Sequence, residues 1–237
     1  MKFPSPLHKA RLLRRYKRFL ADVVLEGDER ETVVHCPNPG SMLGLDAPGS
    51  PVWLSWNGAG KRKYPYTWEI SRADGDLVGI NTNLPNRLVA EALESGKIEQ
   101  LADYGDIRRE VRYGEKSRVD FLLREPGRQD CYLEVKNVHL RRTGDLAEFP
   151  DSVTARGSRH LRELMQMVAN GHRAVMLFVV QRMDCTRFRP AEDIDPLYAH
   201  SFREALEAGV EALCYDCEIT TEGIQLRRPL TLQATGA

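Results

Sequence analysis

The stretch SRVDFLLREPGRQDCYLEVKNV, residues 117–138, has the pattern of a β-hairpin. Two apolar runs flank a Pro-Gly pair that is typical of a turn. Three charged residues interrupt these runs, namely Asp120, Glu134 and Lys136. Strand positions normally favour apolar or β-branched side chains, so these three residues need an explanation beyond packing.

The spacing of the two acids predicts a metal site. If Gly127 centres the turn, Asp120 and Glu134 are directly opposed, with Cβ atoms about 5 Å apart, and Lys136 shares their face. Opposed carboxylates suit Mg²⁺ or Mn²⁺, to which the carbonyl of Val135 could add a ligand. Lys136 could then orient a water or stabilise negative charge. A bulge would break this register, and the alternative is an exposed Glu–Lys pair without metal.

The rest of the chain predicts an all-β part followed by an α/β part. Short strand-like runs with turn signals fill residues 18–82 and indicate a small OB-like barrel. Helical periodicity follows at residues 84–98, with Asn83 as a cap and Gly96 as a stop, and again at 151–171 and 195–209. The apolar run at 173–181 is typical of a strand covered on both faces. We therefore expect an α/β protein with an N-terminal all-β domain, residues 1–80, and a mixed α/β sheet flanked by helices, residues 81–237.

Composition favours a cytoplasmic globular protein. The chain has 237 residues, of which 42% are hydrophobic and 29% are charged, and its formal net charge is zero. No apolar run approaches the roughly 18 residues that span a bilayer, and the basic N-terminal segment lacks the apolar core of a secretory signal. Five irregularly spaced cysteines suggest reduced thiols. We expect no membrane partner, and the sequence is compatible with a homo-oligomer.

Basic residues gather at three places where phosphate could bind. Each cluster also has a structural interpretation, either as a solvated arm or loop or as a helix cap. The candidates for nucleic-acid contact are Arg14, Arg15 and Lys17 near the N-terminus, Lys61, Arg62 and Lys63 in a barrel loop, and Arg156, Arg159 and His160 at a helix start.

Ordered motifs along the whole chain extend these interpretations. They include RRYKRFLADV, HCPNPGSM, KRKYPYTWE, NTNLPNRL, KSRVDFLL, CYLEVKNV and FPDSVTARGSRHLREL. In this set the chain resembles the sugar fermentation stimulation protein family, SfsA. Asp120 followed by an ExK motif also resembles the core of PD-(D/E)xK nucleases.

The resemblance implies an OB-fold-like domain followed by a restriction-endonuclease-like domain. In that nuclease superfamily a helix before the hairpin often adds an acid, and Glu91 is the matching position, with Glu94 as the fallback. Two departures from the family pattern are Pro39, where a threonine is common, and Ala155, where a glutamate is common. Any role of those two side chains is absent from this chain.

Three functional hypotheses follow from the resemblance. The first is a DNA-binding protein of low sequence specificity that regulates sugar (maltose) metabolism and carries a nuclease-like divalent-metal site. The second is an active Mg²⁺- or Mn²⁺-dependent nuclease that hydrolyses phosphodiester bonds. The third is a transcription regulator with a vestigial metal site.

Overall fold

The first part of the chain forms an OB-like barrel. The computed structural model describes residues 1–58, 60, 63–114 and 117–233. Within them, the barrel sheet has the order β3-β2-β1-β4-β5-β6, and a β3–β5 pairing closes it. Its strands are β1 (His8–Tyr16), β2 (Leu20–Leu25), β3 (Glu31–His35), β4 (Pro51–Trp56), β5 (Tyr66–Ala73) and β6 (Asp76–Gly79). The expected barrel is confirmed, and β1 is an additional strand in the basic segment.

The second part is a mixed sheet with the strand order β15-β14-β12-β9-β8-β7. The central strands β9, β12 and β14 are parallel, and the outer pairings are antiparallel. The strands of this sheet are β7 (Asp106–Tyr113), β8 (Ser117–Arg124), β9 (Cys131–Val138), β12 (Arg173–Val180), β14 (Glu211–Ile219) and β15 (Ile224–Pro229). The expected mixed α/β architecture is confirmed, with β7 as a strand that the sequence did not reveal.

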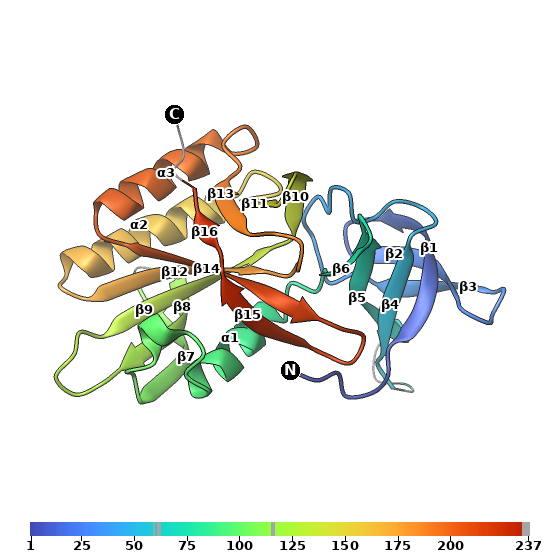
Figure 1. The fold of residues 1–237 in the computed structure, drawn as a ribbon, viewed down its shortest axis with the longest axis horizontal. Coiled ribbons are helices and arrows are strands. Elements are labelled where there is room, and N and C mark those ends of the chain that lie inside the picture. Colours follow the sequence, from blue (N-terminus) through green and yellow to red (C-terminus); the bar gives the residue numbers. More distant parts are fainter. Residues whose placement is uncertain (59, 61–62, 115–116, 234–237) are drawn as a thin grey trace.

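A smaller sheet stands at one end of the large one, with the order β10-β11-β13-β16. It consists of β10 (Leu140–Thr143), β11 (Leu146–Phe149), β13 (Arg187–Pro190) and β16 (Thr231–Leu232). In Figure 1, β10 and β11 lie between the large sheet and the barrel. The chain therefore passes from β9 almost directly into β10 of this smaller sheet, on the side of the barrel.

Helices cover both faces of the large sheet. Helix α1 (Pro85–Glu94) packs on β9 and β15, whereas α2 (Ala155–Ala169) packs on β9 and β12 and against α3 (Pro196–Glu207). A short 3₁₀ helix spans Glu99–Leu101. Leu177 of β12 joins the apolar core on the α1 side, and Phe178 joins the core on the α2 side, which confirms a strand covered on both faces.

The helix ends differ in how well the sequence predicted them. Thr154 caps α2, since its side chain accepts a hydrogen bond from the backbone of Gly157. Asn83 does not cap α1, because that helix begins after Leu84 and has no side-chain cap. Gly96 adopts a positive φ of 68° just after α1, as expected of a stop residue.

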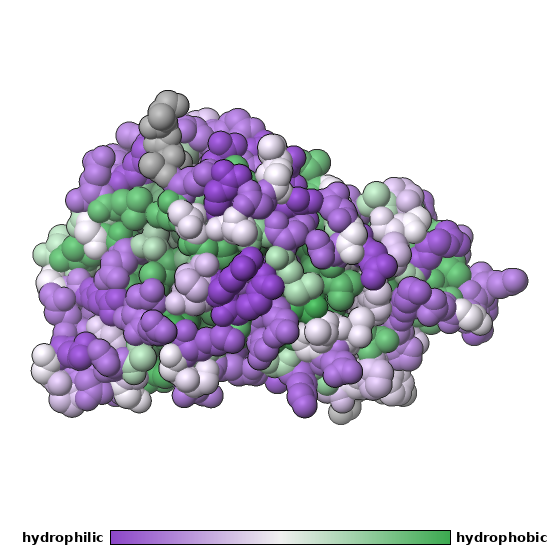
Figure 2. All heavy atoms as spheres, in the orientation of Figure 1, coloured by the Kyte–Doolittle hydropathy of each residue, from purple (hydrophilic) through white to green (hydrophobic). Residues whose placement is uncertain are grey.

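Barrel and sheet share apolar contacts. Trp53 of β4 and Ile70 of β5 belong to the same buried cluster as α1 and the large sheet. Hydrophilic residues dominate the face drawn in Figure 2, with apolar surface in patches. No helix in the described part of the chain is long and apolar enough to cross a membrane.

Candidate metal centre and nucleic-acid interface

The hairpin of β8 and β9 has the predicted register only up to the acids. Phe121 pairs with Leu133, and the next two pairs toward the turn keep the register centred on Gly127. The ladder stops there, so Asp120 is not paired with Glu134. Instead, the backbone N–H of Val135 donates to Asp120 Oδ2 at 2.7 Å. The expected opposition of the two acids was therefore wrong, because this side-chain bond replaces the next ladder bond.

The other neighbour of β8 is also interrupted beside Asp120. Arg109 pairs with Phe121 and Val111 pairs with Val119, but Glu110 between them has φ 53° and no partner across from Asp120. A left-handed conformation is uncommon for a non-glycine residue in a strand. The alternation of β8 also changes here, because Val119 joins the core on the α2 side and Phe121 joins the core on the α1 side. Strand β8 therefore twists at Asp120.

This twist turns Asp120 toward α1. Asn86, in the first turn of α1, donates its Nδ2 to Asp120 Oδ1 at 2.7 Å. Burial raises the pKa of Asp120, and the charge of Glu134 raises it further. The charge of Glu134 therefore affects the pKa of Asp120 even though the two residues are not paired in the ladder.

Glu134 is buried on the side of the sheet that α2 covers, with one carboxylate oxygen hydrogen-bonded and the other without a hydrogen-bond partner. Its side chain is 3% exposed, and its Oε1 contacts Lys136 Nζ at 2.6 Å and His160 Nδ1. Its Oε2 is buried and has no hydrogen-bond partner. Burial alone would raise the pKa of Glu134, but the hydrogen bond from His160 and the charge of Lys136 outweigh burial and lower it. The group is thus an ionised carboxylate with an unsatisfied oxygen.

This donor set fits a divalent cation. An unpaired buried carboxylate oxygen is costly, and a hard cation is a partner that would satisfy it. Asp120 adds a second carboxylate, whose pKa the charge of Glu134 raises. Among the described residues, no group of three His, Cys, Asp or Glu side chains is arranged to hold an ion. Waters or backbone oxygens must therefore complete the coordination, as is usual for Mg²⁺.

Glu91 does not join this cluster. Its carboxylate contacts the N-terminal amine of Met1 at 2.6 Å and Arg87 at 3.5 Å, and its side chain is 42% exposed. Glu94 is also exposed, near the end of α1. The residue of α1 that reaches Asp120 is Asn86, about one and a half turns before Glu91. Glu91, the position that the resemblance implies, therefore lies on a different face of α1 from Asn86.

The basic residues of α2 differ in position. Arg156 and Arg159 are exposed in the first turns of the helix. His160 is 3% exposed and faces Glu134, so it is not an exposed nucleic-acid contact in this structure. Arg156 Nε donates to His160 Nε2 at 3.2 Å, which links the exposed arginine to the buried carboxylate.

Of the N-terminal candidates, only Lys17 is exposed without a described ion pair. Arg15 is 9% exposed, and its Nη2 donates to the backbone carbonyls of Asn38 at 2.9 Å and Gly40 at 2.7 Å. Arg15 therefore holds the loop after β3 and does not offer its guanidinium to phosphate. Arg14 is 72% exposed but pairs with Asp22 at 2.7 Å.

Of the three basic residues in the barrel loop, the structure describes only Lys63. Lys61 and Arg62 lie outside the described residues. Lys63 is exposed, and its Nζ lies 5.5 Å from the centre of the Tyr64 ring. A basic residue beside an aromatic ring is compatible with nucleic acid, as expected of that loop.

Two further polar groups near the acids escaped sequence analysis. Glu163 of α2 accepts from Ser117 Oγ at 2.6 Å, while its Oε2 is buried without a partner. The Tyr113 hydroxyl is also buried and makes no well-formed hydrogen bond; burial raises its pKa, and the charges of Glu134 and Glu163 and an interaction with the Glu163 carboxylate add to the rise. Nothing in the sequence indicated that Tyr113 of β7 and Ser117 of β8 lie beside Glu163 of α2.

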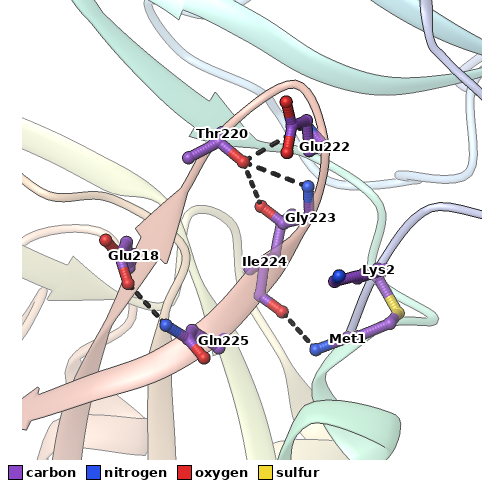
Figure 3. Close-up of a pocket in the computed structure, with 8 residues that line it drawn as sticks. All are labelled: Met1, Lys2, Glu218, Thr220, Glu222, Gly223, Ile224 and Gln225. Carbon is purple, nitrogen blue, oxygen red and sulfur yellow. Dashed lines mark hydrogen bonds between the residues drawn. The ribbon is translucent and has the colours of Figure 1, made fainter.

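A separate cavity of about 350 Å³ lies at the β14–β15 hairpin (Figure 3). Thr220, Glu222 and Gln225 line it together with Met1 and Lys2. Thr220 Oγ1 accepts from the backbone of Gly223 at 3.1 Å, so its hydroxyl closes the hairpin turn. This cavity shares no residue with the carboxylate cluster.

Comparisons with known proteins agree with this architecture. The profile described as "SfsA N-terminal OB domain" matches residues 13–80, and "Sugar fermentation stimulation protein RE domain" matches residues 83–223. The sugar fermentation stimulation protein homolog of Rhodospirillum centenum is 59% identical over 234 residues, which cover 99% of this chain and 100% of that protein. The Jannaschia homolog is 58% identical, over 97% of this chain and 96% of that protein.

A solved relative shares the whole fold. The structure of Pyrococcus furiosus SfsA in complex with Ca²⁺ has a TM-score of 0.88 and 30% identity, and the alignment covers 99% of this chain and 98% of that one. Sequence, fold and matched domains thus agree over nearly the full length. The chain belongs to the sugar fermentation stimulation protein (SfsA) family.

Proposed function

We propose that this protein binds DNA with little sequence preference and holds a divalent cation, Mg²⁺ or Mn²⁺, between Asp120 and Glu134. The observation that carries the proposal is the buried, unpartnered Oε2 of Glu134. Pyrococcus furiosus SfsA was solved in complex with Ca²⁺, which prefers the same oxygen ligands. In this proposal residues 1–80 form the nucleic-acid-binding domain and residues 81–237 the nuclease-like domain.

The residues around the ion would have separate tasks. Asp120, Glu134 and the Val135 carbonyl would hold the cation, which supplies positive charge against a phosphoryl group. Lys136 is held by Glu134 at 2.6 Å and adds a cation beside the same site. Arg156, Arg159, Lys17 and Lys63 are exposed and would contact the sugar-phosphate backbone.

Metal titration tests the site directly. Mn²⁺ binding followed by calorimetry should be lost in Asp120→Asn, a change that keeps the shape of the side chain. The control is Asp130→Asn in the same hairpin, since Asp130 pairs with Arg124 at 2.8 Å and is not one of the proposed ligands. Equal Mn²⁺ affinity in wild type and Asp120→Asn would eliminate this site.

DNA binding is tested by its dependence on salt. Affinity should fall steeply with salt, and Arg159→Gln or Lys17→Gln should each reduce the slope by about one. Arg203→Gln is the control, because Arg203 lies on α3 and pairs with Glu192 at 3.1 Å. Binding that does not respond to salt would contradict the proposal.

A second candidate function is metal-dependent hydrolysis of phosphodiester bonds. The position of Lys136, whose ammonium lies at the carboxylate that would hold the ion, favours it. Cleavage of supercoiled, linear, branched or single-stranded DNA with Mg²⁺ or Mn²⁺ should then disappear in Lys136→Ala while binding survives. Protection of selected promoters without any cleavage would instead favour a regulator of sugar metabolism with a vestigial metal site.

A further inference from the structure

His160 occupies an unusual position for a residue of a basic helix start. It lies in α2 one turn after Arg156, and its side chain is 3% exposed. One ring nitrogen, Nδ1, faces Glu134 Oε1 and lies 3.3 Å from Lys136 Nζ. The other, Nε2, lies 3.2 Å from Arg156 Nε. The imidazole therefore bridges an exposed guanidinium and a buried carboxylate.

The neighbours of the ring determine where its proton lies. A guanidinium N–H can only donate, so His160 Nε2 must present its lone pair to Arg156. Neutral imidazole then carries its hydrogen on Nδ1, which donates to Glu134 Oε1. Lys136 can donate to the same carboxylate oxygen but not to Nδ1. One tautomer, the Nδ1–H form, satisfies the contacts with both Arg156 and Glu134, and the ammonium of Lys136 then bonds the carboxylate rather than Nδ1.

This arrangement gives the two oxygens of Glu134 different roles. Oε1 receives donors from both His160 and Lys136, whereas Oε2 receives none in the described structure. A carboxylate fixed through one oxygen has its other oxygen oriented in advance. Ligand-orienting hydrogen bonds of this kind commonly change metal affinity by about 10-fold to 100-fold.

We propose that His160 is a positioning residue that orients Glu134 for the cation, and that Arg156 links this orientation to phosphate binding. Arg156 uses Nε for His160 and is exposed, so its outer nitrogens can meet a phosphate of DNA. A phosphate that immobilises Arg156 also immobilises the ring and Glu134. Cation and DNA therefore strengthen each other's binding, and the coupling is reciprocal. This inference rests on the proposed metal and DNA sites.

The ring tautomer is the first test and needs neither metal nor DNA. Long-range ¹H–¹⁵N correlation of the metal-free protein at about pH 8 should show His160 protonated at Nδ1 and not at Nε2. An Nε2–H tautomer or a doubly protonated ring would overturn the inference, because neither can accept from Arg156.

Two substitutions separate the functions of the two ring nitrogens. His160→Asn keeps a donor near the position of Nδ1, and His160→Gln keeps a polar group near the position of Nε2. Mn²⁺ affinity measured by calorimetry should stay close to wild type in His160→Asn and fall about 10-fold or more in His160→Gln. If His160→Gln is folded by circular dichroism and binds Mn²⁺ like wild type, the positioning role is refuted.

Arg156→Met tests the coupling, with Arg159→Met as a control of equal charge on the same helix. Ca²⁺ should tighten binding of a labelled duplex to wild type at least about fivefold, and this gain should persist in Arg159→Met and vanish in Arg156→Met. Equal gains in both variants would overturn the link through Arg156. Asp120→Asn distinguishes the failures: if it binds Mn²⁺ normally, the metal site is wrong, whereas the tautomer result stands independently.

Discussion

Asp151 offers a quantitative test of how the barrel is held to the α/β domain. It lies between β11 and α2, and its side chain is 16% exposed. Its Oδ2 accepts from His139 at 3.2 Å and, across the interface, from Ser41 Oγ and the Met42 backbone, each at 3.3 Å. Replacing Asp151 by Asn keeps the size and an acceptor but removes the charge on which these donors converge.

The pKa of Asp151 gives the expected magnitude. Burial alone would raise it, but the hydrogen bond and charge of His139, with the backbone donors of Met42 and Ser41, lower it from 3.8 to about 2. At about 1.4 kcal/mol per unit, this depression contributes about 2 kcal/mol to folding. Because the folded-state pKa is depressed, the contribution is fully present above about pH 4 and is lost as the pH falls through about 2.

Urea unfolding as a function of pH measures this contribution. Asp151→Asn should be about 2 kcal/mol less stable than wild type near neutral pH, and the two curves should converge toward about pH 2. Asp145→Asn is the control, since the pKa of Asp145 is also lowered to about 2, by Arg187 and Thr186, but the group is exposed and screened by solvent. If Asp151→Asn remained about 2 kcal/mol less stable than wild type at low pH, the electrostatic explanation would be refuted.

Three further predictions concern the site and its surroundings. Calorimetry should find Mn²⁺ affinity about tenfold weaker in Asn86→Ala, whereas Glu91→Gln should match wild type, because Asn86 contacts Asp120 and Glu91 contacts the Met1 amine instead. Thermal melting should show Gly40→Ala destabilised by about 1–3 kcal/mol, since an added Cβ would lie 2.4 Å from a carboxylate oxygen of Asp151. The same assay should place Tyr113→Phe within about 1 kcal/mol of wild type, because the lost hydroxyl makes no well-formed hydrogen bond and interacts with Glu163 among the described side chains.

The hairpin shows what its sequence could predict. The turn and the apolar runs determined the register at Phe121 and Leu133, because pairing near a tight turn follows from its centre. The opening at Asp120 could not be predicted, since it depends on contacts from other elements. Asn86 on α1 and the backbone of Val135 together hold the carboxylate away from its ladder position.

The rotation of a helix about its axis was a second feature that the sequence could not predict. Periodicity predicted α1 but not how the helix is turned against the sheet. Residues five apart on a helix point about 140° apart, so Asn86 and Glu91 cannot face the same carboxylate. Asn86 reaches Asp120, and Glu91 reaches the amine of Met1.

Strands made mostly of charged residues were a third feature that the sequence could not predict. Strand β7, DIRREVRY, has buried Tyr113 at its end but otherwise mostly exposed charged residues, so it lacks an apolar pattern. Strand β1, HKARLLRRY, appeared to be a basic arm for the same reason, although Leu12 within it is fully buried. Both strands owe their structure to pairing with neighbours that the local sequence does not encode.

Strand β9 is the element that joins the barrel to the candidate metal site. On the α2 side it presents Glu134 and Lys136, and further along it Asn137 accepts from Gln181 at 2.7 Å and contacts His139 at 3.0 Å. His139 in turn bonds Asp151, which holds the barrel loop. A chain of contacts thus runs from the barrel loop through Asp151, His139 and Asn137 to the strand that carries Lys136. The contacts that dock the barrel loop and those that surround Glu134 therefore come from neighbouring residues of the same stretch of chain.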